Sequence, residues 1–167
     1  MKGAQKFLEI YSAAHGNAED LLSDAELLME RKRYARAYVL AFTALEEISK
    51  SQLAADVYTG FISEDKFWDV YRDHTQKVGR MAWASDEARR YPDPETEDYL
   101  EVHEPEIKSR MSALYVECDR PTVKSPSELI TGEMAKSVIH TVRVALQQIV
   151  EVTDYYGHQI GTKGFMK

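Results

Sequence analysis

The stretch Tyr34–Tyr58 constrains this chain most, because it is apolar on nearly every side of a helix and yet carries Glu46, Glu47 and Lys50 in its middle. A helix that is hydrophobic all round is normally surrounded by other elements rather than lying on a surface. Charges in such a helix need partners, because a buried and unpaired carboxylate is costly. The sequence therefore predicts a small polar cluster inside or beside the core.

Three further stretches carry the apolar spacing of packed helices. Along residues 5–30, 64–90 and 131–156 the stripe residues alternate four and three positions apart, while the helix predicted over 34–59 carries a broader stripe. This spacing puts them on one stripe of each helix. His74 falls on the stripe of the third helix. With no strand in this pattern, the sequence predicts an all-α fold, an antiparallel four-helix bundle in a single domain over residues 1–167.

Residues 91–130 form a long irregular insertion between the third and fourth predicted helices. Tyr91-Pro92 ends the third helix, because the residue before a proline disfavours the helical region. Within the insertion we predict a short helix over 105–114 and a helix start at Ser125, which has Glu128 three positions later. Long excursions of this kind are often functional or mobile.

Composition indicates a soluble protein. The 167 residues are 44% hydrophobic and 29% charged, as in ordinary globular domains, and no apolar run approaches membrane-spanning length. The first residues lack the apolar core of a signal peptide. A lone cysteine, Cys118, cannot form an internal disulfide. We therefore expect a reducing, cytoplasmic location and no contact with a membrane.

The formal net charge of −7 weighs against broad, sequence-independent binding of nucleic acids. It does not exclude a local basic site, and two groups of cationic residues are candidates. They are Arg31, Lys32, Arg33 and Arg36 at one turn, and Arg72, Lys77 and Arg80 along the third helix. Runs of this kind usually form a solvated face, and that is our expectation for both.

The charged residues of the second helix and His74 are the first candidates for chemistry. Lys50 lies four positions after Glu46 and three after Glu47, so both carboxylates can reach its ammonium group on a helix. Such a cluster either solubilises one flank of the helix or has a functional role, and the apolar surroundings make the two readings about equal. If the second and third helices are neighbours, a carboxylate of Glu46 or Glu47 would orient the His74 imidazole.

Several familiar signatures are absent from the sequence. There is no Glu-x-x-His, no His-Glu-x-x-His, no cysteine and histidine spacing typical of zinc, and no glycine-rich phosphate loop. Cys118 has no evident activating partner. We therefore predict neither a metal nor a cofactor.

Four short motifs carry a resemblance to a known family. YARAYVLAFT followed by ALEEISK in the second helix, RDHTQK in the third and SRMSALYVECD in the insertion resemble the AbiV family of abortive-infection proteins, which belongs with the HEPN-like helical bundles. The resemblance runs from the second helix to the last. It implies a cytoplasmic prokaryotic protein that limits phage propagation by shutting down translation. The residues that it implicates are Glu46, Glu47, Lys50, His74, Lys77, Arg110 and Tyr115.

Many HEPN proteins are metal-independent ribonucleases that act as dimers, with an arginine and a histidine separated by four to six residues. None of the five histidines here has an arginine at that distance upstream, and Arg72 lies only two positions before His74. Our leading hypothesis is therefore a homodimeric defence protein that binds a phage or host protein or the translation machinery. The alternative is a ribonuclease in which His74 is the general acid or base and Lys77 or Arg110 stabilises the phosphate charge.

A third hypothesis, a magnesium-dependent nucleotide pyrophosphohydrolase, would place carboxylates on facing helices. Glu46 and Glu47 with Glu151 and Asp154 imitate that arrangement, but Lys50 occupies a position where another carboxylate would be needed.

Overall fold

The computed structural model describes the backbone of residues 2–156 and the side chains of residues 5–149. Within this range the fold is almost entirely helical, as predicted. The helices are α1 (Lys2–Glu30), α2 (Tyr34–Tyr58), α3 (Glu64–Arg72), α4 (His74–Gly79), α5 (Ala82–Ala88), α6 (Ile107–Leu114), α7 (Pro126–Leu129) and α8 (Gly132–Tyr156). The strands are β1 (Glu117–Asp119) and β2 (Thr122–Lys124).

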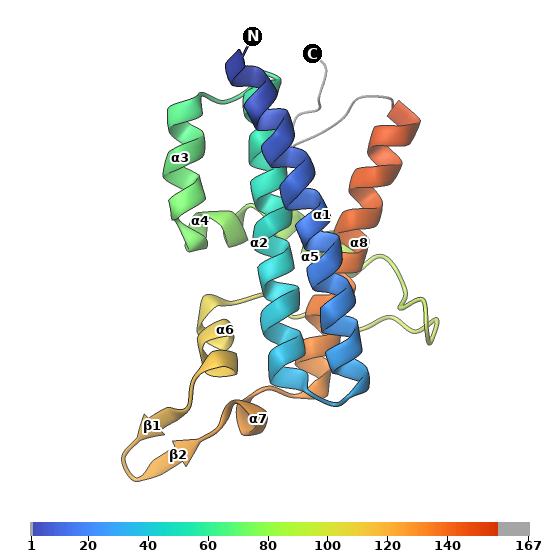
Figure 1. The fold of residues 1–167 in the computed structure, drawn as a ribbon. Helices are drawn as coiled ribbons and strands as arrows, with labels where there is room; N and C mark the ends of the chain where they lie inside the picture. The colour runs from blue at the N-terminus through green and yellow to red at the C-terminus, as the bar shows by residue number, and fades with distance from the viewer. Residues whose placement is uncertain (1, 157–167) are drawn as a thin grey trace.

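Helix α2 lies at the centre of the molecule. It forms an antiparallel hairpin with α1, packs along α8, and also contacts α3, α4, α6 and α7 (Figure 1). Buried residues occur on all its faces, which agrees with its all-round apolar sequence. Contacts within the chain account for this breadth without a subunit contact. Among the described residues, none of the helices combines the length and the apolarity needed to cross a bilayer.

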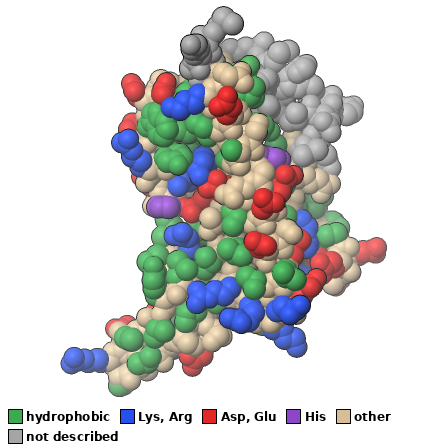
Figure 2. Space-filling model, in the orientation of Figure 1, with side chains coloured by type: hydrophobic (Ala, Val, Ile, Leu, Met, Phe, Trp, Pro, Cys, Tyr) green, Lys and Arg blue, Asp and Glu red, His purple; other side chains and the backbone are tan. Residues whose placement is uncertain are grey.

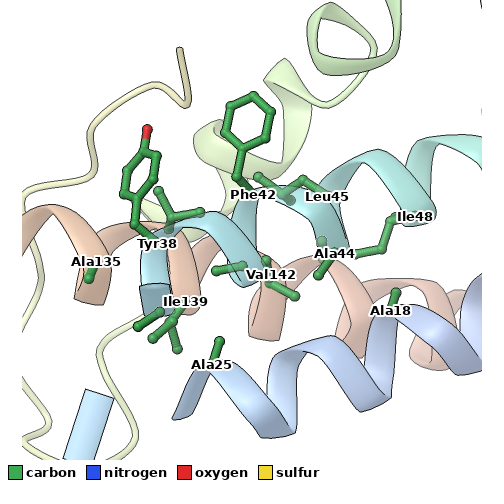
Figure 3. Close-up of a cluster of buried hydrophobic side chains, with 14 of the residues drawn as sticks. Ala18, Ala25, Tyr38, Phe42, Ala44, Leu45, Ile48, Ala135, Ile139 and Val142 are labelled. Carbon is green, nitrogen blue, oxygen red and sulfur yellow. The ribbon is translucent and has the colours of Figure 1, made fainter. Parts of the chain in front are cut away.

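The main core fills the space between α1, α2 and α8. Figure 3 shows small residues of α1, such as Ala18 and Ala25, on the side of the cluster where Ile48 of α2 and Val142 of α8 lie. Alanines on α1 let its backbone approach α2 closely, while the bulky side chains of the other two helices fill the remaining volume. This packing fixes α2, and therefore every side chain that α2 carries.

The predicted third helix, 64–90, is wrong as a single helix, because the structure divides it into α3, α4 and α5. The first break falls at Asp73, which leaves the helical region (φ −104°, ψ 105°) and caps α4 by accepting a hydrogen bond from the backbone N–H of Gln76 at 3.1 Å. An aspartate side chain that binds its own backbone competes with helix continuation. The break resets the helical phase, so the predicted placement of His74 in the apolar seam is also wrong.

The insertion between α5 and α8 is more ordered than its sequence indicates. Helix α6 and helix α7 flank an antiparallel hairpin in which Cys118 pairs with Val123, a strand pair that the sequence did not predict. All six strand residues are exposed, so the hairpin has no buried face to give its sequence an apolar alternation. Together α6 and the hairpin form an arm that projects from the bundle (Figure 1).

Candidate functional site

Glu46 is the centre of the candidate site. It lies midway along α2, and its side chain is only 5% exposed. One carboxylate oxygen, Oε1, pairs with Nδ1 of His74 at the start of α4. This is the contact that the sequence proposed between the second and third helices. A buried carboxylate bound to an imidazole is the arrangement that holds a histidine in one orientation for proton transfer.

His74 reaches Glu46 because a new helix begins beside it. Asp73 caps α4, and its second oxygen accepts a hydrogen bond from the Gln76 side chain at 2.9 Å. These hydrogen bonds from Gln76 lower the pKa of Asp73. The His74 side chain is 55% exposed, and its pairing engages only Nδ1. The opposite nitrogen, Nε2, is therefore available to a ligand that approaches from solvent.

Arg110 of α6 approaches the other oxygen of the same carboxylate. Its Nη2 lies 3.9 Å from Oε2 of Glu46, and its guanidinium carbon lies 5.6 Å from the centre of the Phe42 ring. The Nε atom of Arg110 is buried without a hydrogen-bond partner in the described structure. The side chain as a whole is 23% exposed, so the outer part of the guanidinium group can donate to an anionic oxygen.

Tyr38 holds α6 in the position that brings Arg110 to Glu46. Its hydroxyl group forms hydrogen bonds with the Ser109 side chain and the Glu106 backbone. Burial raises the pKa of Tyr38, and these hydrogen bonds offset only part of that effect. Because Ser109 directly precedes Arg110, the contact of Tyr38 with Ser109 determines where Arg110 lies along α2.

Glu47 and Lys50 form a second, adjacent part of the cluster. The Lys50 ammonium pairs with Glu47, lies 5.3 Å from the centre of the Tyr71 ring, and shares that ring with Lys77, whose ammonium is 5.7 Å away. Lys77 itself is buried. Glu47, Lys50 and Tyr71 line a cleft of about 430 Å³ between α1, α2 and α3. Lys77 therefore belongs to this part and not to the His74–Arg110 part.

Tyr115 does not join the cluster. It caps the end of α6 on the projecting arm, where it is 60% exposed. The structure thus brings together Glu46, His74 and Arg110 on one side and Glu47, Lys50 and Lys77 on the other. It leaves Tyr115 on a separate surface.

The carboxylates of the cluster face cations rather than one another. Within the described side chains no group of three or more His, Cys, Asp or Glu residues lies close enough to hold a metal ion. Glu46 pairs with His74 and Arg110, and Glu47 pairs with Lys50. The side chains of Glu151 and Asp154, the other carboxylates of the pyrophosphohydrolase hypothesis, lie outside the described residues.

Three aromatic residues of the site were missing from the sequence-based candidates. Tyr38 anchors α6, Phe42 lies beneath Arg110, and Tyr71 receives both lysines. In the sequence, Tyr38 and Phe42 look like any other residue of the apolar stripe, so nothing marks them as part of a site. Asp73 did have a local signal, because an aspartate three positions before Gln76 is typical of a helix start.

The fold is all-α, which is consistent with the HEPN-like class. A sequence model described as AbiV matches residues 6–147, and the chain belongs to this HEPN family of abortive-infection proteins. No curated protein matches the chain in a sequence search. No solved structure matches it either.

Proposed function

We propose that this abortive-infection protein limits phage propagation by cleaving RNA of the translation machinery at Glu46, His74 and Arg110. The observation that carries the proposal is the pairing of the His74 imidazole with the buried Glu46 carboxylate. The arginine that the sequence lacks upstream of His74 is supplied from α6, because Arg110 approaches the same carboxylate. This geometry favours the ribonuclease hypothesis over binding alone.

The chemistry requires no nucleophile from the protein, because RNA contains one. In our proposal Nε2 of His74 takes the proton of a ribose 2′-hydroxyl group as general base. The 2′-oxygen then bonds to the adjacent phosphorus while the bond from phosphorus to the 5′-oxygen breaks. Water protonates the departing 5′-oxygen, and the hydroxide that remains takes the proton from the His74 imidazolium. The products are a 2′,3′-cyclic phosphate and a 5′-hydroxyl end.

Arg110 and Glu46 have separate roles in this step. The guanidinium group of Arg110 faces the negative charge that develops on the phosphate oxygens. Glu46 stabilises the imidazolium that forms when His74 takes the proton. Lys77 has no part in this step, because it is buried against Tyr71.

The test is expression of the wild type and of His74→Ala in a host, with phage yield, growth and RNA integrity scored together. We expect the wild type to restrict phage and cut RNA, and His74→Ala to lose both effects while staying folded. His103→Ala is the matched control, because His103 is exposed and contributes its backbone N–H, not its ring, to the hydrogen bond with Ser137. Phage restriction with intact RNA would overturn the proposal.

A second candidate function, binding of a phage or host protein, is favoured by the projecting arm. Met111, Tyr115, Val116 and Val123 are between 46% and 67% exposed there. Exposed apolar groups gathered on one surface mark sites of protein interaction. The double variant Val116→Ser with Val123→Ser tests this function, because it makes two exposed apolar positions of the arm polar. Loss of phage restriction with RNA cleavage retained would assign the defence to the arm, and retained restriction would exclude it.

We also propose that the protein is a cytoplasmic homodimer, because many HEPN proteins act as dimers and the resemblance implies a cytoplasmic protein. Light scattering on the purified protein tests the subunit number directly. A monomer at the concentrations where RNA is cut would remove the dimer from the proposal.

A further inference from the structure

The turn between α1 and α2 gathers four cationic side chains that the proposed site does not use. Arg31, Lys32, Arg33 and Arg36 are all exposed. Among the described residues none of them forms an ion pair with a carboxylate. Figure 2 shows Lys and Arg side chains gathered toward the end of the molecule where Figure 1 places this turn. Uncompensated cations stand out on a protein whose net charge is −7.

Three of these cations surround a cleft. Lys32, Arg33 and Arg36 line a hollow of about 460 Å³ together with residues that precede α8, among them Ser127 and Ile130. The cleft therefore has cationic donors on one wall and a hydroxyl group and an apolar floor opposite. A volume of this size accommodates a phosphate group with part of the sugar attached to it.

The start of α2 adds to the positive potential of the cleft. Arg33 occupies the N-cap position, where no side chain caps the helix, and the first turn of α2 contains no acidic residue. Like charges held close together repel one another, and a bound anion offsets this repulsion. The cleft thus combines three cationic side chains with the positive end of a long helix, and both attract a phosphate.

The cleft and the proposed site lie along one helix. Arg36 is ten positions before Glu46 on α2, which corresponds to about 15 Å along the helix axis. Between them the less buried stripe of α2 passes through Leu40 and Thr43 toward Glu47 and Lys50. A polynucleotide strand bound at Arg36 that follows this stripe reaches Glu47 and Lys50, the part of the cluster adjacent to the Glu46–His74 pair.

We propose that this cleft binds a backbone phosphate of the RNA that the Glu46–His74–Arg110 site acts on, and so positions the strand at a distance from the site of cleavage. The inference rests on the proposed function. It assigns the charged turn, which the sequence indicated only as a solvated face, to substrate binding. The ligand is a phosphate of a polynucleotide, because only a continuous strand can occupy the cleft and the Glu46–His74–Arg110 site at the same time.

The test measures binding without cleavage. The probe is a fluorescent single-stranded RNA with 2′-O-methyl groups, which cannot be cut by attack of the 2′-oxygen, and anisotropy is recorded over a range of salt concentrations. We expect Arg33→Ala with Arg36→Ala to weaken binding and to reduce the magnitude of the slope of log affinity against log salt by about 0.7, the contribution of one phosphate contact on a single strand.

Lys66→Ala with Arg120→Ala is the matched control. It removes the same charge from two exposed positions that do not line the cleft. We expect this variant to keep the wild-type slope. Equal slopes for the cleft variant and the control, with both proteins folded, would overturn the inference. So would a wild type that binds inorganic phosphate in the cleft as tightly as the oligonucleotide.

Failure of this inference is distinguishable from failure of the proposed function. If the cleft variant binds like the wild type while unmodified RNA is still cut in a His74-dependent manner, the proposed site stands and the cleft is not its binding surface. If the oligonucleotide binds through the cleft but unmodified RNA stays intact, the cleft is confirmed and the cleavage chemistry is wrong.

Discussion

His74 and Glu46 are 28 positions apart in the chain, and the imidazole of the first pairs with the buried carboxylate of the second. This relationship joins α4 to the central helix α2. It also determines which imidazole nitrogen faces solvent. Substitutions in and around this pair separate its structural consequences from its chemical ones.

Glu46→Ala removes the shared partner of His74 and Arg110. We expect the free energy of unfolding to fall by about 1–3 kcal/mol, because the groups around the lost carboxylate are left without their hydrogen bonds. Glu46→Gln keeps the volume and one acceptor, and we expect it to stay closer to wild-type stability while cleavage is lost. Urea unfolding and an RNA cleavage assay on the same preparations check this prediction. Full activity in Glu46→Gln would show that the charge of Glu46 is not needed.

Asp73→Ala tests whether the start of α4 positions His74. We expect the loss of this helix cap to lower the free energy of unfolding by about 0.5–2 kcal/mol. Cleavage should fall as well, because the orientation of His74 depends on the break that Asp73 creates. Asp73→Asn is the control, since asparagine caps helices about as well as aspartate. Thermal unfolding and RNA cleavage are the measurements, and equal activity in both variants would contradict the prediction.

Phe42→Ala opens a cavity between α2 and α6. Phe42 is completely buried, and its ring lies under the Arg110 guanidinium group. We expect the free energy of unfolding to fall by about 3–5 kcal/mol, which is typical when alanine replaces a buried aromatic residue. Leu27→Ala, at a position that is 53% exposed, should change stability by less than about 0.5 kcal/mol. Urea unfolding midpoints of the two variants decide the prediction.

Asp93 gives the fold a dependence on pH. Burial by itself raises the pKa of this carboxyl group, but the Lys136 ammonium at 2.5 Å, the Glu95 backbone N–H and the Thr96 hydroxyl outweigh burial, so the pKa is lowered from 3.8. A carboxyl group whose pKa is lower in the folded state stabilises the fold fully when the pH is above the pKa of the unfolded state. This stabilisation is lost as the pH falls through the pKa of the folded state. The wild type should therefore lose stability in acid, below about pH 4.

Asp93→Asn should reduce the loss of stability between neutral and acid pH. Asp20→Asn is the control, because Asp20 is exposed and its replacement should leave the dependence of stability on pH unchanged. The measurement is the urea midpoint at a series of pH values from neutral to acid. Parallel profiles for the wild type and Asp93→Asn would show that another group dominates the acid response.

The sequence by itself determined the helical architecture and the central position of α2. Periodic apolar residues predict long helices because burial of one stripe is a local property of the sequence, and α1, α2 and α8 lie within a few residues of their predicted ranges. The same reasoning placed Glu46, Glu47 and Lys50 in a polar cluster beside the core.

Only the tertiary structure decided which of these charges meet. Glu46 and Glu47 are adjacent in sequence, yet one pairs with His74 and approaches Arg110, while the other pairs with Lys50. The division depends on the break at Asp73 and on the position in which Tyr38 holds α6. Contacts of this kind depend on how separate helices pack, and a stripe of apolar residues does not specify which helix faces which. The physical reason is that helix formation is governed by neighbours in the chain, whereas the site is built by side chains that only folding brings together.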